Sequence, residues 1–148
     1  MKLVGLVAVL LASGLCSSPD LLTATVGGGG SQSAKVGEAV QLVIKVSNTG
    51  PPIPHLGLVF RTPDRWYERH KVTDLGGCAI DAEASAFDCG DLAKSESKTY
   101  SFRGTATAPG TFHYELALRE LVQPYPYVND HPDGPDVQAW DETVSAAS

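Results

Sequence analysis

Turn-forming residues interrupt this chain at short intervals, and this spacing limits its fold more than any other feature. Glycine occurs 15 times and proline 10 times in 148 residues, and they cluster in segments such as 50–52 and 108–110. Between such clusters, apolar residues recur at every second position, which is the period of a β-strand with one buried face. No segment beyond the N-terminal 18 residues shows the 3.6-residue period of an amphipathic helix. The chain is therefore expected to consist of short strands joined by tight turns.

The clearest alternation lies in segment 40–46, where Val40, Leu42, Ile44 and Val46 share one face. Segments 98–107 and 112–118 alternate in the same way, and the turn between them predicts a hairpin. Further strands are expected at 22–26, 56–60, 72–75, 87–89 and 137–144. Segment 122–128 contains two prolines, which predict an edge segment or an extended arm. About seven or eight strands at this spacing indicate an all-β protein with a single β-sandwich.

The first 18 residues have the pattern of a removable export signal. Lys2 supplies a positive start, residues 3–11 form an uncharged apolar run, and small residues follow. The run is shorter than the roughly 20 apolar residues that a membrane-spanning helix needs. Cys16 offers a second interpretation, a lipid anchor, although Leu15 stands where bacterial lipoprotein signals have a small residue. The protein is thus expected to be secreted or at the cell surface, with a lipid anchor as its only membrane attachment.

One domain is expected after the export signal. Residues 19–34 contain a short strand and then four consecutive glycines, which favour a linker or a loop between paired strands. Residues 35–148 would form the sandwich. With 43% hydrophobic and 19% charged residues, the chain has enough apolar material for a core.

Cys78 and Cys89 are the two cysteines outside the export segment. An even pair in an exported chain predicts a disulfide rather than reactive thiols. Two isolated thiols would make a poor metal site, because zinc normally takes four ligands. A bridge that closes so short a loop would stabilise the fold by about 3 kcal/mol.

Several short motifs resemble a known family. They are Gly-Glu-Ala-Val at 37–40, Val-Ser-Asn-Thr-Gly-Pro at 46–51, Phe-Asp-Cys-Gly-Asp-Leu at 87–92 and Ala-Thr-Ala-Pro-Gly at 106–110. This series resembles the bacterial conserved-repeat β-sandwich domains, which are immunoglobulin-like and occur in surface and cell-wall proteins. The resemblance covers about residues 35–145 and implies the same fold, with a disulfide at the places of Cys78 and Cys89.

This chain departs from that family in two ways. It carries one copy of a domain that usually occurs as tandem repeats. It also has Lys-Ser-Glu-Ser at 94–97, where the family usually has Pro-Gly-Glu-Ser. The missing glycine leaves the backbone conformation of that turn open. Because the shared motifs are turn and core residues, the resemblance implies a fold rather than a function.

The formal net charge of −6 disfavours two classes of partner, nucleic acids and anionic membrane surfaces, because both require a basic surface. No Gly-x-Ser-x-Gly motif is present, and His55, His70, His113 and His131 do not share helical spacing. A zinc site made from these histidines would have to be assembled by the tertiary structure. No enzymatic activity, cofactor or metal is therefore expected.

Residues 129–136 place a carboxylate at about every third position around Gly134, which suggests weak calcium binding by an irregular loop. The spacing is not that of an EF-hand, because His131 and Trp140 stand where oxygen ligands belong. The other interpretation is a solvated acidic loop.

The segment 61–71 interleaves Arg61, Arg65 and Arg69 with Trp66 and Tyr67. Arginine side chains make bidentate hydrogen bonds to carboxylates, and aromatic rings stack on sugars or on partner side chains. After residue 119 the chain has no lysine or arginine and gathers carboxylates instead. A basic aromatic segment and an acidic end on one domain favour contact with another protein or with a second copy. For Trp66 the alternative is packing between the sheets.

The sequence thus predicts a non-enzymatic interaction or structural module that contacts a surface protein or itself. The alternative is a carbohydrate-binding module for cell-wall glycans. In that case the rings that stack on sugars would come from Trp66, Tyr67, Tyr125, Tyr127 or Trp140.

Overall fold

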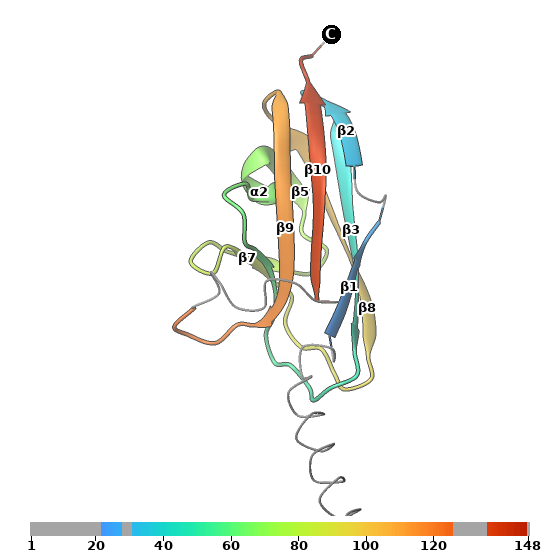
Figure 1. Ribbon diagram of the computed structural model, residues 1–148, viewed down its shortest axis with the longest axis vertical. Coiled ribbons are helices and arrows are strands. Elements are labelled where there is room, and N and C mark those ends of the chain that lie inside the picture. The colour runs from blue at the N-terminus through green and yellow to red at the C-terminus, as the bar shows by residue number, and fades with distance from the viewer. Residues whose placement is uncertain (1–21, 28–30, 126–135, 148) are drawn as a thin grey trace, which may run out of the picture.

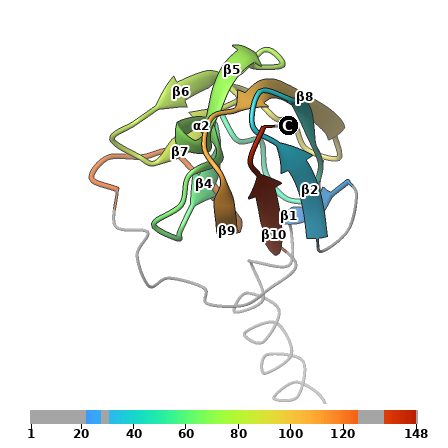
Figure 2. The same cartoon turned by 90° about the horizontal axis from the view of Figure 1, so that it is seen from above.

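A computed structural model gives the structure of residues 22–27, 31–125 and 136–147, which contain ten strands in two facing sheets (Figure 1). The four-stranded sheet has the order β1 (Leu22–Val26), β3 (Ala39–Asn48), β8 (Ser97–Ala106) and β5 (His70–Asp74). The six-stranded sheet has the order β2 (Ser31–Lys35), β10 (Val137–Ser145), β9 (Gly110–Glu120), β4 (Leu56–Phe60), β7 (Ala86–Asp88) and β6 (Ala79–Asp81). A four-residue helix, α2 (Trp66–Arg69), connects β4 to β5. Seen from above, β5 and β8 lie on one side of the sandwich, and β9 and β10 lie on the other (Figure 2).

The strand order is that of an immunoglobulin-like sandwich, and it confirms the predicted fold class. The neighbours β1, β3, β8 and β5 take the places of strands A, B, E and D, while β10, β9 and β4 take those of G, F and C. The hairpin β6–β7 is inserted between strands D and E and extends the second sheet beyond β4. Strand β2 pairs in parallel with β10, so the N-terminal strand is divided between the two sheets.

Alternation along the long strands places the core between the sheets. On β3, Leu42 and Ile44 are fully buried, whereas Lys45 is exposed. Their register partners on β8 are Phe102 and Tyr100, which face the same core. Each large apolar side chain buried in this way stabilises the fold by about 1.5–3 kcal/mol relative to exposure.

The predicted hairpin of segments 98–107 and 112–118 is wrong. The two segments form β8 and β9, which belong to different sheets. The turn at 107–109 exists, but it carries the chain across the sandwich. Alternation cannot distinguish the two arrangements, because strands that face each other across a core show the same apolar period as strands paired in one sheet.

The domain boundary expected at residue 35 is also wrong, because two earlier segments belong to the sandwich. Strand β1 pairs with β3 from Leu22 opposite Asn48 to Val26 opposite Ile44, and β2 pairs with β10. The sequence of β2 is Ser-Gln-Ser-Ala-Lys, which lacks apolar alternation and explains why no strand was predicted there. Of the glycine run, Gly27 donates its N–H to the Val43 carbonyl at 2.9 Å, and residues 28–30 lie outside the described residues.

Residues 1–21, with the expected export signal and Cys16, lie outside the described ranges. Within those ranges, no helix has the length and apolar character needed to cross a bilayer.

Residues 121–125 fold back over the outer side of the six-stranded sheet as an arm. Gly57 on β4 makes room for this arm, since a Cβ there would lie 2.7 Å from Leu121 Cγ. Val59 packs against the arm residues Leu121 and Tyr125 in a small cluster separate from the main core. Both faces of β4 are therefore covered, and all five of its residues are buried. The segment predicted as an edge or an arm is an arm up to residue 125, and residues 126–128 lie outside the described ranges.

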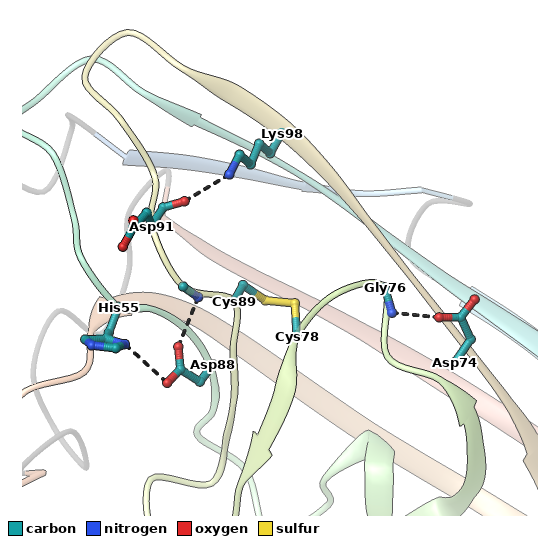
Figure 3. The surroundings of a disulfide bond; sticks show 9 residues. His55, Asp74, Gly76, Cys78, Asp88, Cys89, Asp91 and Lys98 are labelled. Carbon is teal, nitrogen blue, oxygen red and sulfur yellow. Dashed lines mark hydrogen bonds and ion pairs between the residues drawn. A yellow bond between two sulfur atoms is a disulfide. The ribbon is translucent and has the colours of Figure 1, made fainter.

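The predicted disulfide between Cys78 and Cys89 is present, with Cα atoms 4.2 Å apart (Figure 3). The two cysteines are the neighbours of Ala79 and Asp88, which are register partners, so the bridge links the strands at the open end of the β6–β7 hairpin. Beside it, Asp88 Oδ1 accepts a hydrogen bond from the Gly90 N–H at 3.0 Å, and Asp88 Oδ2 lies 3.5 Å from His55 Nδ1 (Figure 3).

Asn48 fastens the turn after β3 to the turn before β8. Its side chain is buried, and its Nδ2 donates to the carbonyls of Pro51 at 2.9 Å and Ala93 at 3.2 Å. In the second turn, Ser95 has a left-handed backbone with a φ of 62°. The turn therefore keeps a conformation that suits glycine, although this chain has serine there.

Candidate functional site

The segment 61–70 runs from β4 through α2 to β5, and its tryptophan lies in the core. The Trp66 side chain is fully buried and stacks on the His70 ring with centroids 4.1 Å apart. Gly104 on β8 makes room for this stack, because a Cβ there would lie 3.2 Å from Trp66 Cη2 and 2.9 Å from His70 Cβ. Trp140 is only 2% exposed. Neither tryptophan can offer a ring face to a partner, so both drop out of the predicted binding residues.

Each arginine of this segment has a carboxylate partner in the same molecule. The pairs are Arg61 with Glu115, Arg65 with Glu68, and Arg69 with Asp64. The guanidinium of Arg69 also lies 4.7 Å from the centroid of the Phe112 ring. The predicted basic segment is therefore largely neutralised where it stands.

The acidic C-terminal end is paired within the molecule as well. The pairs are His70 with Glu142, His113 with Asp141, and Arg119 with Asp136. The first of these joins the basic segment directly to the acidic end. Head-to-tail pairing of two molecules through these charges stays a prediction, and it would have to displace ion pairs that each molecule already makes. Asp130 and Asp133 lie outside the described residues.

Glu142 joins His70 and Tyr114 in a polar cluster buried between the sheets. His70 Nε2 lies 2.9 Å from Glu142 Oε2, and the Tyr114 hydroxyl donates to Glu142 Oε1 at 2.9 Å. His70 Nδ1 lies 2.8 Å from the Trp66 carbonyl oxygen, which can only accept, so Nδ1 carries a hydrogen. Burial, and next the charge of Glu142, raise the pKa of Tyr114 far above its usual range, so the phenol stays a donor.

A pocket of about 340 Å³ lies at the end of β4, on the outer side of the six-stranded sheet. We call it the arginine–tyrosine pocket, after Arg61, Arg65 and Tyr125 in its wall. Its remaining wall comes from residues 59–60, 62–63 and 83–85. The Tyr125 hydroxyl donates to Asp81 Oδ2 at 3.2 Å, which ties the arm to β6.

The two arginines of this pocket differ in how firmly they are held. The Arg61 side chain is 11% exposed and bonds to Glu115 through both Nε and Nη2. Arg65 and Glu68 are 35% and 53% exposed, and Arg65 Nη1 lies 3.1 Å from Glu68 Oε1. An exposed pair of this kind contributes only about 0–1 kcal/mol, so its carboxylate can be exchanged for another.

Two features of the pocket wall are uncommon in folded proteins. Arg65 Nε is shielded from solvent and has no hydrogen-bond partner among the described residues. Ser85, in the wall, has a left-handed backbone with a φ of 55°, while its carbonyl accepts from the Phe60 N–H at 2.8 Å. Unsatisfied donors and strained non-glycine residues are rare in proteins and gather at binding sites.

The pocket brings together residues from two separate predictions. Arg61 and Arg65 come from the predicted basic segment, and Tyr125 from the predicted sugar platform. Arg69 lies outside the pocket wall, and Tyr67 packs on Phe60 with centroids 6.1 Å apart. Tyr127 is outside the described residues. Glu83 and Ser85 are not among the residues predicted from the sequence. The one signal for this region is Gly57, since a glycine inside a strand indicates close approach of another segment.

Within the described ranges, no three or more His, Cys, Asp and Glu side chains come close enough together to hold a metal ion. His55 and His113 each face a single aspartate, at 3.5 Å and 2.6 Å, and His131 lies outside these ranges. Asp136, a candidate calcium ligand, is buried and lies 2.6 Å from Arg119 Nη1. The rest of the 129–136 loop is outside the description.

Fold and pocket define an immunoglobulin-like β-sandwich with a candidate binding pocket on its six-stranded sheet. No protein family matches the sequence, and no curated protein matches it. Among solved structures, the chain is similar to the CARDB domain of the PF1109 protein from Pyrococcus furiosus, determined in complex with di-metal ions. That likeness has 16% identity and a TM-score of 0.49, and covers 85% of this chain and 94% of that chain.

Two further structures are similar to this chain. One is PapD-like domain 7 of human CEP192, at 12% identity and a TM-score of 0.43, covering 88% of each chain. The other is a non-cellulosomal cohesin from Archaeoglobus fulgidus, at 13% identity and a TM-score of 0.40, covering 86% of this chain and 91% of that chain. Identities this low transfer no ligand or activity to this chain, and kinship with the conserved-repeat domains stays a prediction.

Proposed function

We propose that this protein is a non-enzymatic interaction module that acts outside the cytoplasm. It binds an acidic side chain of a partner protein in the arginine–tyrosine pocket. One observation carries the proposal: the pocket is already formed, and its wall joins the partly exposed Arg65 and the Tyr125 ring with both apolar and polar residues. Binding pockets are mostly apolar with a few placed polar groups, and their volumes start at about 300 Å³.

Arg65 is the residue expected to contact the partner. Its present partner, Glu68, is half exposed and can be displaced at little cost in stability. A carboxylate that entered the pocket would meet the planar guanidinium in the forked geometry that arginine prefers. Arg65 Nε is shielded from solvent, so an acceptor reaches it only if the side chain shifts; such a contact would relieve a buried unsatisfied donor, which otherwise costs about 1–3 kcal/mol.

Arg61 and Tyr125 would shape the pocket rather than exchange partners. Arg61 is fixed by Glu115 and keeps the 61–65 loop on the sheet. Tyr125 is fixed by Asp81 and presents part of its ring to the pocket. A preformed wall reduces the entropy lost on binding, which favours affinity.

Location outside the cytoplasm is supported by two features of the chain. The first 18 residues have the pattern of an export signal. The disulfide between Cys78 and Cys89 is of a kind that persists in oxidising compartments and is rare in the cytosol. Kinship with bacterial conserved-repeat surface domains is a further part of this proposal, and it rests on the motifs at 46–51 and 87–92.

The test is capture from the surface fraction of the producing cell, with the oxidised protein as bait. A photo-crosslinking residue in place of Glu83, at the pocket wall, identifies what lies in the pocket. Arg65→Gln is the test variant, and Lys94→Gln, which removes one exposed cation elsewhere, is the matched control. We expect one protein to crosslink to the wild-type bait and the Lys94→Gln bait, and to be lost with Arg65→Gln.

Self-association is a form of the same proposal and is read out separately. Sedimentation velocity would then show a dimer or larger species that Arg65→Gln converts to monomer. Crosslinking that is equal for all three baits, or confined to wall polysaccharide, would overturn the proposal. Half-buried Tyr125 and Tyr67 are the described rings left for a sugar platform once the two tryptophans are assigned to the core.

A further inference from the structure

The outer face of the four-stranded sheet differs in charge from the rest of this acidic protein. Residues that alternate with the core on its strands point away from the sandwich. Three of them are exposed cations, Lys45 on β3, Arg103 on β8 and Lys71 on β5. Serine and threonine predominate between them, including Thr99 and Thr105, which lie opposite Lys45 and Lys71. We call this surface the cationic face.

None of these three cations has an ion-pair partner in the described part of the chain. Five other basic residues do: Arg61, Arg65, Arg69, Lys98 and Arg119. One carboxylate stands beside them: Asp74, at the end of β5, is the register partner of Arg103 across a bulge, and its Oδ1 accepts from the Gly76 N–H at 2.8 Å. A protein with a net charge of −6 thus keeps one sheet face on which three cations outnumber this single carboxylate.

The three cations lie on a diagonal across adjacent strands. Lys45 stands opposite Thr99, four residues before Arg103, and Lys71 stands opposite Thr105, two residues after it. At about 3.3 Å per residue, they span about 20 Å along the strands. A single small anion cannot contact all three, whereas an extended polymer with repeated negative charges can.

We propose that the cationic face binds an acidic polysaccharide, a chain of sugars that carry carboxylates. Arg103 offers a forked contact to a carboxylate, and the two lysines act as point charges. Serine and threonine hydroxyls both donate and accept hydrogen bonds, which matches sugar hydroxyls. A protein partner fits this face less well, because the centres of protein interfaces are apolar and aromatic. Among the outward residues of these four fully described strands, Val43 is the only large apolar one.

This surface is independent of the arginine–tyrosine pocket, which lies on the outer side of the other sheet. It also moves the sugar contact expected from the sequence to a different part of the molecule. Trp66 and Trp140 are in the core, and recognition would instead use charges and hydroxyls on β3, β5 and β8.

The test measures binding of the oxidised protein to immobilised polygalacturonate by biolayer interferometry, in salt from 20 to 300 mM (about 0.3 M screens charges beyond roughly 6 Å). The test variant is Lys45→Gln with Lys71→Gln. Its control, Lys35→Gln with Lys94→Gln, removes the same charge from exposed positions off the face. We expect the test variant to weaken binding about tenfold or more, the control to stay within about twofold of wild type, and added salt to weaken wild-type binding.

Three results would overturn the inference: no binding at the lowest salt, equal losses in the two variants, or tighter binding to polyphosphate or polyglutamate than to polygalacturonate. Dextran, which is uncharged, should not bind. Arg65→Gln should bind polygalacturonate like wild type. Failure of the cationic face can therefore be told apart from failure of the pocket.

Discussion

Two pairs of ionisable side chains in this molecule make similar contacts at opposite extremes of solvent exposure. His70 and Glu142 lie between the sheets with side chains that are 0% exposed, 2.9 Å apart. Arg65 and Glu68 lie at the arginine–tyrosine pocket with side chains that are 35% and 53% exposed, 3.1 Å apart. The separation of the two side chains is nearly the same in both pairs, so the difference in their roles comes from their access to water.

In the buried pair, every polar atom that loses its partner also lacks water as a substitute. Removing one member of such a pair leaves an unsatisfied group in the core, which is strongly destabilising. In the exposed pair, water replaces whichever partner leaves, so the pair contributes little. The buried pair is therefore fitted to hold the two sheets in place, and the exposed pair to exchange partners.

The largest effect is expected from the buried side of this comparison. Glu142→Leu leaves His70 Nε2 and the Tyr114 hydroxyl without partners, and should lower the free energy of unfolding by about 3–5 kcal/mol. Urea unfolding followed by tryptophan fluorescence measures this. Glu68→Leu, the matched change in the exposed pair, should alter stability by less than about 1 kcal/mol. Similar losses of stability in Glu142→Leu and Glu68→Leu would show that burial does not distinguish the two pairs.

A double variant sharpens the assignment of that loss to unsatisfied atoms. When His70→Leu and Glu142→Leu are combined, both members of the pair are removed, so neither is left buried without its partner. The double variant should therefore lose less stability than the sum of the two single variants. An additive result would mean that each side chain contributes by packing alone.

The disulfide gives the next largest effect. Replacing Cys78 and Cys89 by serine should lower the free energy of unfolding by about 3 kcal/mol, because the bridge closes a short loop in the unfolded chain. The shift in urea midpoint measures the loss, and wild-type protein in excess dithiothreitol should unfold at the same midpoint as the double serine variant. If both keep the midpoint of the oxidised protein, the bridge does not contribute to stability.

A gain in stability is expected in the turn before β8. Ser95 has a φ of 62°, a conformation that glycine adopts without strain, so Ser95→Gly should stabilise the protein by about 1 kcal/mol. Ser95→Ala is the control, because alanine keeps the Cβ and should bring no gain. Differential scanning calorimetry checks both, and a lower melting temperature for Ser95→Gly than for Ser95→Ala would contradict the strain argument.

The sequence predicts those parts of this fold that depend on local patterns. Alternation located β3, β8 and β9, and the two cysteines identified the bridge. Pairing between strands was less accessible, because the 98–107 and 112–118 segments look alike whether they pair in one sheet or face each other across the core. Strand β2 was missed because its place is set by parallel pairing to β10, more than a hundred residues away.

The candidate site was predictable in composition but not in arrangement. Arg61, Arg65 and Tyr125 are each predicted from the sequence as possible contacts for a partner or a sugar, yet nothing local indicates that Tyr125 reaches the 61–65 loop. That contact depends on Leu121 lying over Gly57, which is a tertiary event. For Trp66 the sequence leaves partner contact and packing between the sheets as alternatives, and it gives no sign of the role of Glu142, because burial between two sheets depends on strands that are distant in sequence.

The smallest effect on stability is expected at Arg65, and it carries the most weight for function. Arg65→Gln removes an exposed ion pair and should change the free energy of unfolding by less than about 0.5 kcal/mol. The same change should abolish crosslinking at the pocket, because the glutamine amide cannot attract a carboxylate as a guanidinium does. Urea unfolding and photo-crosslinking of one preparation give both values. Arg61→Gln is the contrast: Arg61 is 11% exposed, so its loss should lower stability and distort the pocket together. If Arg65→Gln destabilises the protein as much as Arg61→Gln, Arg65 stabilises the fold. The distinction between a fixed Arg61 and an exchangeable Arg65 would then be wrong.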